Sequence, residues 1–145
     1  MMTKNNTMGA KAPHIIGIDP GVKNIGFVLS EGIRIIDAHT FKDTEYMLLS
    51  LLLYIKKFHP VVVIEDILLY RPNANAKEII KLIGKIELIC RWSGCQLMEY
   101  IPRMKDEVKI TPEIDQNLER LKDEHQRDAY LLICYYVQNK LNPFL

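Results

Sequence analysis

The sequence feature that most constrains the fold is an uninterrupted run of branched apolar residues, VVVI, at positions 61–64. β-Branched side chains favour extended backbone. A strand without polar alternation is typical of one that is buried on both faces. Such a strand needs packing elements on each side of its sheet, so the run predicts an α/β fold with helices on the faces of the sheet.

The neighbouring segments extend this prediction to eight elements. Three short strands, joined by two short connections, are expected to form an antiparallel meander before the first helix. The order β-β-β-α-β-α-β-α then gives a mixed five-stranded sheet flanked by helices. The expected strands are 15–19, 25–29, 33–38, 61–64 and 96–101, and the expected helices are 44–58, 76–92 and a stretch with room for a break at 111–139.

The composition fits one folded domain. The chain has 145 residues, of which 48% are hydrophobic, and 19 basic residues against 18 acidic ones. We expect a flexible leader over residues 1–13 and a single domain over 14–145. The sequence contains no apolar segment long enough to serve as a signal peptide or to span a membrane. We therefore expect an intracellular, cytoplasmic protein. The near-neutral charge argues weakly against a nucleic-acid partner.

Three cysteines, Cys90, Cys95 and Cys134, match no zinc or redox spacing. We expect them to be buried free thiols in a reducing compartment.

Acidic residues close two of the predicted strands. Asp19 ends the segment IIGID, and Glu65 ends VVVIE. A lone acid at such a place is most simply a turn or helix-cap carboxylate. Further along, His125 and Asp128 share one face of the last helix, where a hydrogen-bonded structural pair is the simplest interpretation. Asp123 and Glu124 lie beside them in a charged run that is typical of a solvated face.

Taken together, these residues predict a different role, because all of them are expected at one end of the sheet. Clustered carboxylates must hold protons or bind cations. An oxygen-rich site with one imidazole suits Mg²⁺ or Mn²⁺. Two such ions ~4 Å apart activate water and stabilise the leaving oxygen in phosphodiester cleavage. The pattern therefore indicates phosphoryl hydrolysis at Asp19, Glu65, His125 and Asp128.

Four segments in the same order resemble the motifs of RuvC-type Holliday junction resolvases, in the ribonuclease H-like superfamily. They are GIDPGVKNIGFVL, VVVIEDILLYRPNANAKEIIKLIGKI, MEYIPRMKDEVK and HQRDAYLLICYY. The resemblance covers about residues 15–138. It implies a metal-dependent, structure-selective endonuclease that resolves four-way DNA junctions in recombination and repair, as a homodimer making paired symmetric nicks.

The resemblance also assigns roles to single residues. Asp19, Glu65 and Asp128 fall on the family's catalytic acids, and His125 falls where many members carry Asp and some carry His. The implied cofactor is Mg²⁺, with Mn²⁺ as a substitute and two ions per active site. The segment between Val108 and His125 is shorter than in bacterial members, which suggests a compact phage, viral or divergent variant acting at a nucleoid or viral replication site. A companion helicase is not assumed.

The family carries a wedge residue in the loop after the strand-terminal Glu. Here that loop is LLYRPNAN, in which Tyr70 is favoured over Leu69 because an aromatic ring stacks on an unpaired base. Residues 71–109 contain eight Lys or Arg and five Asp or Glu. We therefore expect a basic surface on this segment, although the net charge of the whole chain is small. The candidate DNA contacts there are Arg71, Asn73, Lys77, Lys81, Lys85, Arg103, Lys105 and Lys109.

Three alternatives stay open at this point. The first segment also resembles YqgF-type resolvase-like nucleases that act on RNA, although the Asn-Ala helix of the second segment favours the junction resolvases. A ribonuclease H-like module that binds nucleic acid without cutting it would be expected to lack one of the acids. An actin-like or sugar-kinase-like half is disfavoured because the chain is too short to close a nucleotide cleft.

Overall fold

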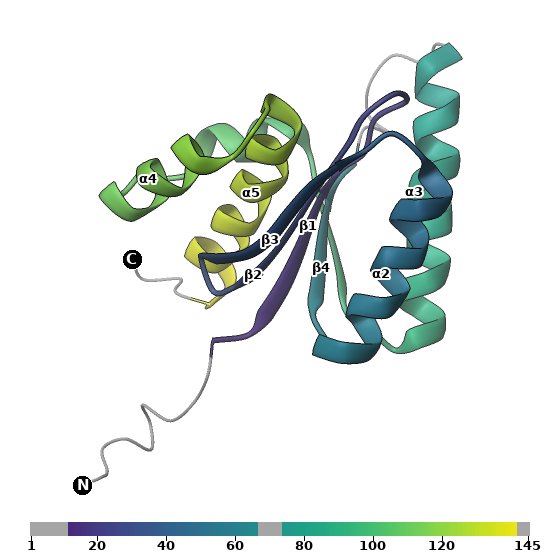
Figure 1. Cartoon of the computed structure of the whole chain (residues 1–145), viewed down its shortest axis with the longest axis horizontal. Helices are drawn as coiled ribbons and strands as arrows, with labels where there is room; N and C mark the ends of the chain where they lie inside the picture. The colour runs from purple at the N-terminus through teal and green to yellow at the C-terminus, as the bar shows by residue number, and fades with distance from the viewer. Residues whose placement is uncertain (1–11, 67–73, 142–145) are drawn as a thin grey trace, which may run out of the picture.

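A five-stranded sheet runs through the middle of the molecule, with two helices against each face (Figure 1). The structure is a computed structural model that describes residues 12–66 and 74–141. The strands are β1 His14–Asp19, β2 Ile25–Glu31, β3 Arg34–Phe41, β4 Val61–Glu65 and β5 Leu97–Tyr100. The helices are α2 Thr44–Phe58, α3 Ala74–Ser93, α4 Pro112–Arg120 and α5 Glu124–Tyr136, with a 3₁₀ helix η1 at Pro102–Glu107 and a π turn η2 at Val137–Leu141.

The sheet has the mixed topology that the sequence predicts. Its strand order is β3-β2-β1-β4-β5. β1 and β3 both pair with β2 in the antiparallel sense, while β4 pairs in parallel with β1 and with β5. Ile18 of β1 lies opposite Ile64 of β4. The next residues along the two strands, Asp19 and Glu65, therefore meet at the same edge of the sheet.

Alternate residues of the central strands enter two separate cores, as expected for strands buried on both faces. Ile16 and Ile18 pack with α2 and α3 on one side, whereas Ile15 packs with α5 on the other. In β4, Val62 and Ile64 join the first core and Val63 joins the second. The prediction drawn from the VVVI run is confirmed.

The long C-terminal helix is divided, and the break has a clear local cause. Thr111 caps α4 by accepting a hydrogen bond from the N–H of Ile114, at 3.3 Å. The helix ends at Arg120, and Asp123 then caps α5 by accepting from the N–H of Gln126, at 2.9 Å. A second N-cap inside a helical stretch starts a new helix. The 3₁₀ helix at Pro102–Glu107 lies in a segment for which the sequence predicted neither helix nor strand.

Residues 1–11 of the expected leader lie outside the described residues, and residues 12 and 13 have no regular structure. No helix in the described part of the chain is long and apolar enough to cross a membrane.

Helix α5 packs against the backbone of the sheet at two glycines. A Cβ added to Gly17 would lie 2.3 Å from the carbonyl O of Ala129, and one added to Gly26 would lie 1.9 Å from that of His125. Both distances are far below any real contact with a backbone atom. The missing side chains of β1 and β2 therefore set how closely the first turns of α5 approach the sheet.

We predict that Gly26→Ala lowers the free energy of unfolding by at least about 2 kcal/mol, because its methyl group has no room beside the backbone of α5. Gly84→Ala is the matched control, since a Cβ there meets nothing within 4 Å. It lies in a helix interior, so it should stabilise the protein by ~0.5–1 kcal/mol. Urea denaturation measures both changes, and equal stability of the two variants would contradict the packing described here.

Candidate active site

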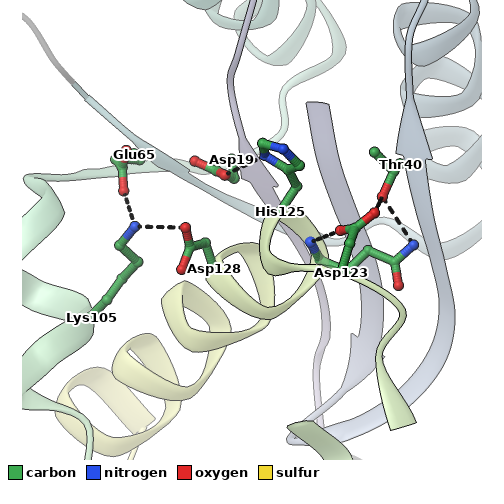
Figure 2. A network of polar contacts seen from close by, with 8 residues as sticks. Asp19, Thr40, Glu65, Lys105, Asp123, His125 and Asp128 are labelled. Carbon is green, nitrogen blue, oxygen red and sulfur yellow. Dashed lines mark hydrogen bonds and ion pairs between the residues drawn. The ribbon is translucent and has the colours of Figure 1, made fainter. Parts of the chain in front are cut away.

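The four residues predicted to form a catalytic site come together at one edge of the sheet (Figure 2). Asp19 and Glu65 are the last residues of β1 and β4, and each is only 8% exposed. His125 and Asp128 come from the first two turns of α5, which lies across this edge. Adjacent parallel strands bring their carboxyl ends to the same side, so the topology itself gathers the acids.

A fifth residue, Lys105 of η1, holds the group together. Its Nζ lies 2.6 Å from Oε1 of Glu65 and 3.4 Å from Oδ2 of Asp128. On the other side of the site, Nδ1 of His125 lies 3.6 Å from Oδ2 of Asp19 (Figure 2). Four separate segments of the chain, namely the ends of β1 and β4, η1 and α5, thus contribute charge to one small region.

The sequence singled out Lys105 only as one of several candidate phosphate contacts. Its position between two acids depends on the unpredicted 3₁₀ helix, which turns this lysine inward while Arg103 in the same segment is exposed. Nothing in the spacing of the basic residues separates Lys105 from Lys109, because the difference arises from the backbone between Pro102 and Val108.

The electrostatics of the site leave negative charge in excess. Burial, together with the charges of Glu65 and Asp128, raises the pKa of the Asp19 carboxyl from 3.8 to about 7, although Lys105 acts in the opposite direction. Burial by itself would lower the pKa of Lys105, but its contact with Glu65 outweighs this effect and raises the pKa. One ammonium therefore stays charged among three carboxyl groups, and one of the three is readily protonated.

The donor set suits a hard divalent cation. It consists of carboxylate oxygens and one imidazole, which are ligands for Mg²⁺ and Mn²⁺. Oε1 of Glu65 is buried and has no donor in good hydrogen-bonding geometry, so its contact with Lys105 is a close ion pair. Within residues 12–66 and 74–141, no three His, Cys, Asp or Glu side chains are gathered tightly enough to surround one ion. A cation here would share Glu65 and Asp128 with Lys105 or replace it.

A second polar network fixes the start of α5 beside the site. Oδ2 of Asp123 accepts a hydrogen bond from the hydroxyl of Thr40 in β3, at 2.6 Å. Thr40 accepts in turn from Nε2 of the buried Gln126, at 3.1 Å. Asp123 therefore serves as a helix cap tied to the sheet, and it faces away from Asp19 and Glu65 (Figure 2). The sequence placed this acid on a solvated face and gave no indication of its partner in β3.

The remaining candidate residues lie outside this cluster. Lys77, Lys81 and Lys85 are exposed along α3, and Nζ of Lys81 lies 3.7 Å from Oε1 of Glu78. Arg103 and Lys109 are exposed near η1. The predicted wedge and loop contacts, Leu69, Tyr70, Arg71 and Asn73, fall outside the described residues.

We predict that Asp19→Asn stabilises the metal-free protein at pH 8 but changes it little at pH 4. The raised pKa means that the folded protein holds a proton on Asp19 between about pH 4 and pH 7, where the unfolded chain has lost it. Stability is thus lost as the pH rises through that window, and the uncharged Asn removes the loss, by about 1 kcal/mol or more at pH 8. Thermal unfolding in EDTA measures the change.

Asp115→Asn is the control for that experiment. Asp115 is an exposed carboxylate on α4, and its substitution should have little effect at either pH. If both substitutions change the thermal stability equally at pH 8, burial of the charged Asp19 carboxylate does not destabilise the folded protein.

Comparison with known proteins defines the class of fold first. The mixed five-stranded sheet with helices on both faces is a ribonuclease H-like fold. No family model matches the sequence, and no curated protein matches it at a significant level.

Solved structures then narrow the class to the fold of RuvC-type resolvases. RuvC of Thermus thermophilus in complex with a Holliday junction substrate has a TM-score of 0.74 and 17% identity, over 88% of this chain and 96% of that one. A second T. thermophilus RuvC structure has a TM-score of 0.68 and 18% identity, over 86% and 95% of the two chains. The yeast mitochondrial Holliday junction resolvase Ydc2 has a TM-score of 0.52 and 13% identity, over 92% and 87%.

Proposed function

We propose that this protein is a metal-dependent, structure-selective endonuclease that resolves four-way DNA junctions by paired symmetric nicks. One observation carries the proposal: Asp19, Glu65, His125 and Asp128 converge at one sheet edge of a fold shared with RuvC. Phosphodiester hydrolysis needs an activated water and compensation for charge on the phosphate. A cluster of carboxylates with one imidazole supplies the ligands for ions that provide both.

The chain's own residues divide this work between them. Glu65 and Asp19 would hold Mg²⁺ or Mn²⁺ from the sheet, and Asp128 and His125 would complete the set from α5. When bound, the ion lowers the pKa of a water molecule and stabilises the leaving oxygen. The imidazole of His125 would bind the metal through a neutral ring nitrogen, which is the usual histidine ligand.

In this proposal Lys105 binds the phosphate in addition to pairing with the acids. Its ammonium already lies within 3.4 Å of Asp128 and is largely buried, so it is held near the place where a phosphate would be cut. If Glu65 and Asp128 held a cation, the ammonium of Lys105 would be released from both carboxylates at that place. The released ammonium can then pair with an oxygen of the phosphate.

The junction itself would be bound through phosphate contacts on the basic surface. Single phosphate contacts are weak and salt-dependent, so a limited set favours selection by junction shape over tight binding to any duplex. We propose these contacts and a Tyr70 wedge, with Leu69 as its alternative, as the DNA-binding residues. The set comprises Arg71, Asn73, Lys77, Lys81, Lys85, Arg103, Lys105 and Lys109.

A homodimer is supported by an exposed apolar surface on α2 and α3. An open groove along α2 reaches Ser93 at the end of α3. It is lined by Leu49, Leu52, Leu53, Ile55, Lys56, His59 and Ser93. On α2, Leu53 is 67% exposed, and on α3 Trp92 is 86% exposed. Large apolar side chains gathered on one face of a small protein mark an interaction surface. A two-fold pair of subunits would present two active sites to a two-fold junction.

We predict that the purified protein with Mg²⁺ or Mn²⁺ cuts a synthetic four-way junction at two symmetric positions and spares linear duplex. Asp19→Asn should retain junction binding but lose at least ~100-fold in the cutting rate, because it replaces a metal ligand without changing its shape. Labelled junctions on denaturing gels measure cutting, and mobility shifts in Ca²⁺ measure binding.

Asp115→Asn, a carboxylate remote from the site, should cut at the wild-type rate. A normal cutting rate in Asp19→Asn would contradict the assignment of Asp19 as a metal ligand. A protein that ignores junctions but degrades structured RNA would be a resolvase-like ribonuclease instead, and one that binds junctions with every acid intact but never cuts would be a binding module.

We predict further that Leu53→Lys converts a dimer into a folded monomer. The substitution places a charge in the apolar surface of α2, whereas Ile110→Lys makes the same change at an exposed apolar residue just before α4, on the opposite side of the sheet. Sedimentation velocity should give the dimer mass for wild type and Ile110→Lys and the monomer mass for Leu53→Lys. A wild-type protein that stays monomeric at micromolar concentration would refute the proposed dimer.

A further inference from the structure

The last turn of α3 brings two cysteines together through its backbone. Gly94 has a φ of +71°, a left-handed conformation that ends the helix. The N–H of Cys95 donates to the carbonyl of Cys90 at 2.8 Å, and the N–H of Gly94 donates to that of Arg91 at 3.3 Å. This pair of bonds is a Schellman motif, in which the first and last residues usually touch through their side chains. Here both of those residues are cysteines.

The surroundings hold the two sulfur atoms in this arrangement. Sγ of Cys95 lies 3.0 Å from the carbonyl O of Pro60, just before β4. Cys90 is buried against the core on the α2 and α3 side, whereas Cys95 is half-buried. Both cysteines line an open depression, together with Arg91, Glu87 and Glu99. The third cysteine, Cys134, is fully buried in the core on the opposite face of the sheet.

The two thiols differ in reactivity in the way that a dithiol exchange requires. A hydrogen bond from Cys90, with a further contribution from the N–H of Val62, lowers the pKa of the Cys95 thiol, although its partial burial acts in the opposite direction. The same contact, together with burial, raises the pKa of Cys90. Thiolate character and access decide which sulfur reacts first. Cys95 is therefore the thiol that attacks first, and Cys90 is the thiol that reacts in the second step.

We propose that Cys90 and Cys95 form a reversible disulfide by exchange with a small-molecule disulfide such as oxidised glutathione. The Cys95 thiolate attacks one sulfur of that disulfide, whose S–S bond breaks and releases one thiolate. Cys90 then loses its proton and attacks Sγ of Cys95, which releases the second thiolate. The two protein thiols give up two protons and two electrons, and the small disulfide is reduced to two thiols.

The bridge would act on stability and not on the proposed nuclease site. It joins the last turn of α3 to the residues that lead into β5, beside the beginning of β4. Gln96 already accepts a hydrogen bond from the N–H of Val62 here, at 2.9 Å. Glu65 lies at the other end of β4. Closing this short loop should raise the melting temperature by a few degrees.

The test exposes the folded, full-length protein to oxidised glutathione under argon and maps the products by peptide mass spectrometry. We expect one linkage, between Cys90 and Cys95, which dithiothreitol reverses, while Cys134 stays a free thiol. The melting temperature should rise by roughly 5 °C on oxidation and return on reduction.

Two single variants separate the steps. Cys90→Ser should stop at the mixed disulfide, so that Cys95 gains the mass of one glutathione. Cys95→Ser should leave Cys90 unmodified because Cys90 is buried. Wild-type protein that stops at the mixed disulfide, or Cys134 that reacts as fast as Cys95, would overturn the proposal. The readout is independent of nuclease activity, so failure of either proposal leaves the other standing.

Discussion

The close approach of α5 to the sheet is the contact on which the candidate site depends. The backbone of this helix lies directly over β1 and β2 because Gly17 and Gly26 present no side chains to it. Its N-terminal cap, Asp123, is anchored sideways to Thr40 of β3. The two glycines therefore set the distance of the helix from the sheet, and hydrogen bonds from its residues to β3 help to fix its orientation. Both constraints act within one turn of His125 and Asp128, so small changes in packing are transmitted directly to the charged groups.

Electrostatic cost is the second organising factor. The strand ends bring Asp19 and Glu65 to one edge, and α5 adds Asp128, so the fold itself concentrates negative charge in a mostly buried region. Water solvates this charge poorly. The protein offsets it partly with Lys105 and partly by allowing Asp19 to keep a proton near neutral pH. Structures optimised for stability alone avoid such an arrangement, which is why it points to chemistry.

Much of this was predictable from the sequence, and the exceptions have physical reasons. The VVVI run and the two short connections predicted the sheet, because burial on both faces leaves a pattern within single strands. Asp19, Glu65, His125 and Asp128 were identifiable because charged residues were predicted at buried strand ends and on the apolar face of a helix. The inward turn of Lys105 and the bond from Thr40 to Asp123 were not, since each joins residues far apart in the chain. The Cys90 and Cys95 contact is an intermediate case: it follows from a helix-ending glycine, which a search for known metal and redox spacings does not detect.

The position of Lys105 also has a consequence for how the protein folds. A cluster of acids that depended on an outside cation would leave a newly made chain unable to fold until that cation arrived. Here part of the balancing charge is carried by the polypeptide itself, on a segment only a few residues beyond β5. If the site binds a cation as proposed, folding and metal binding are then separate events. For the proposed nuclease, the metal-free protein would then be folded but inactive.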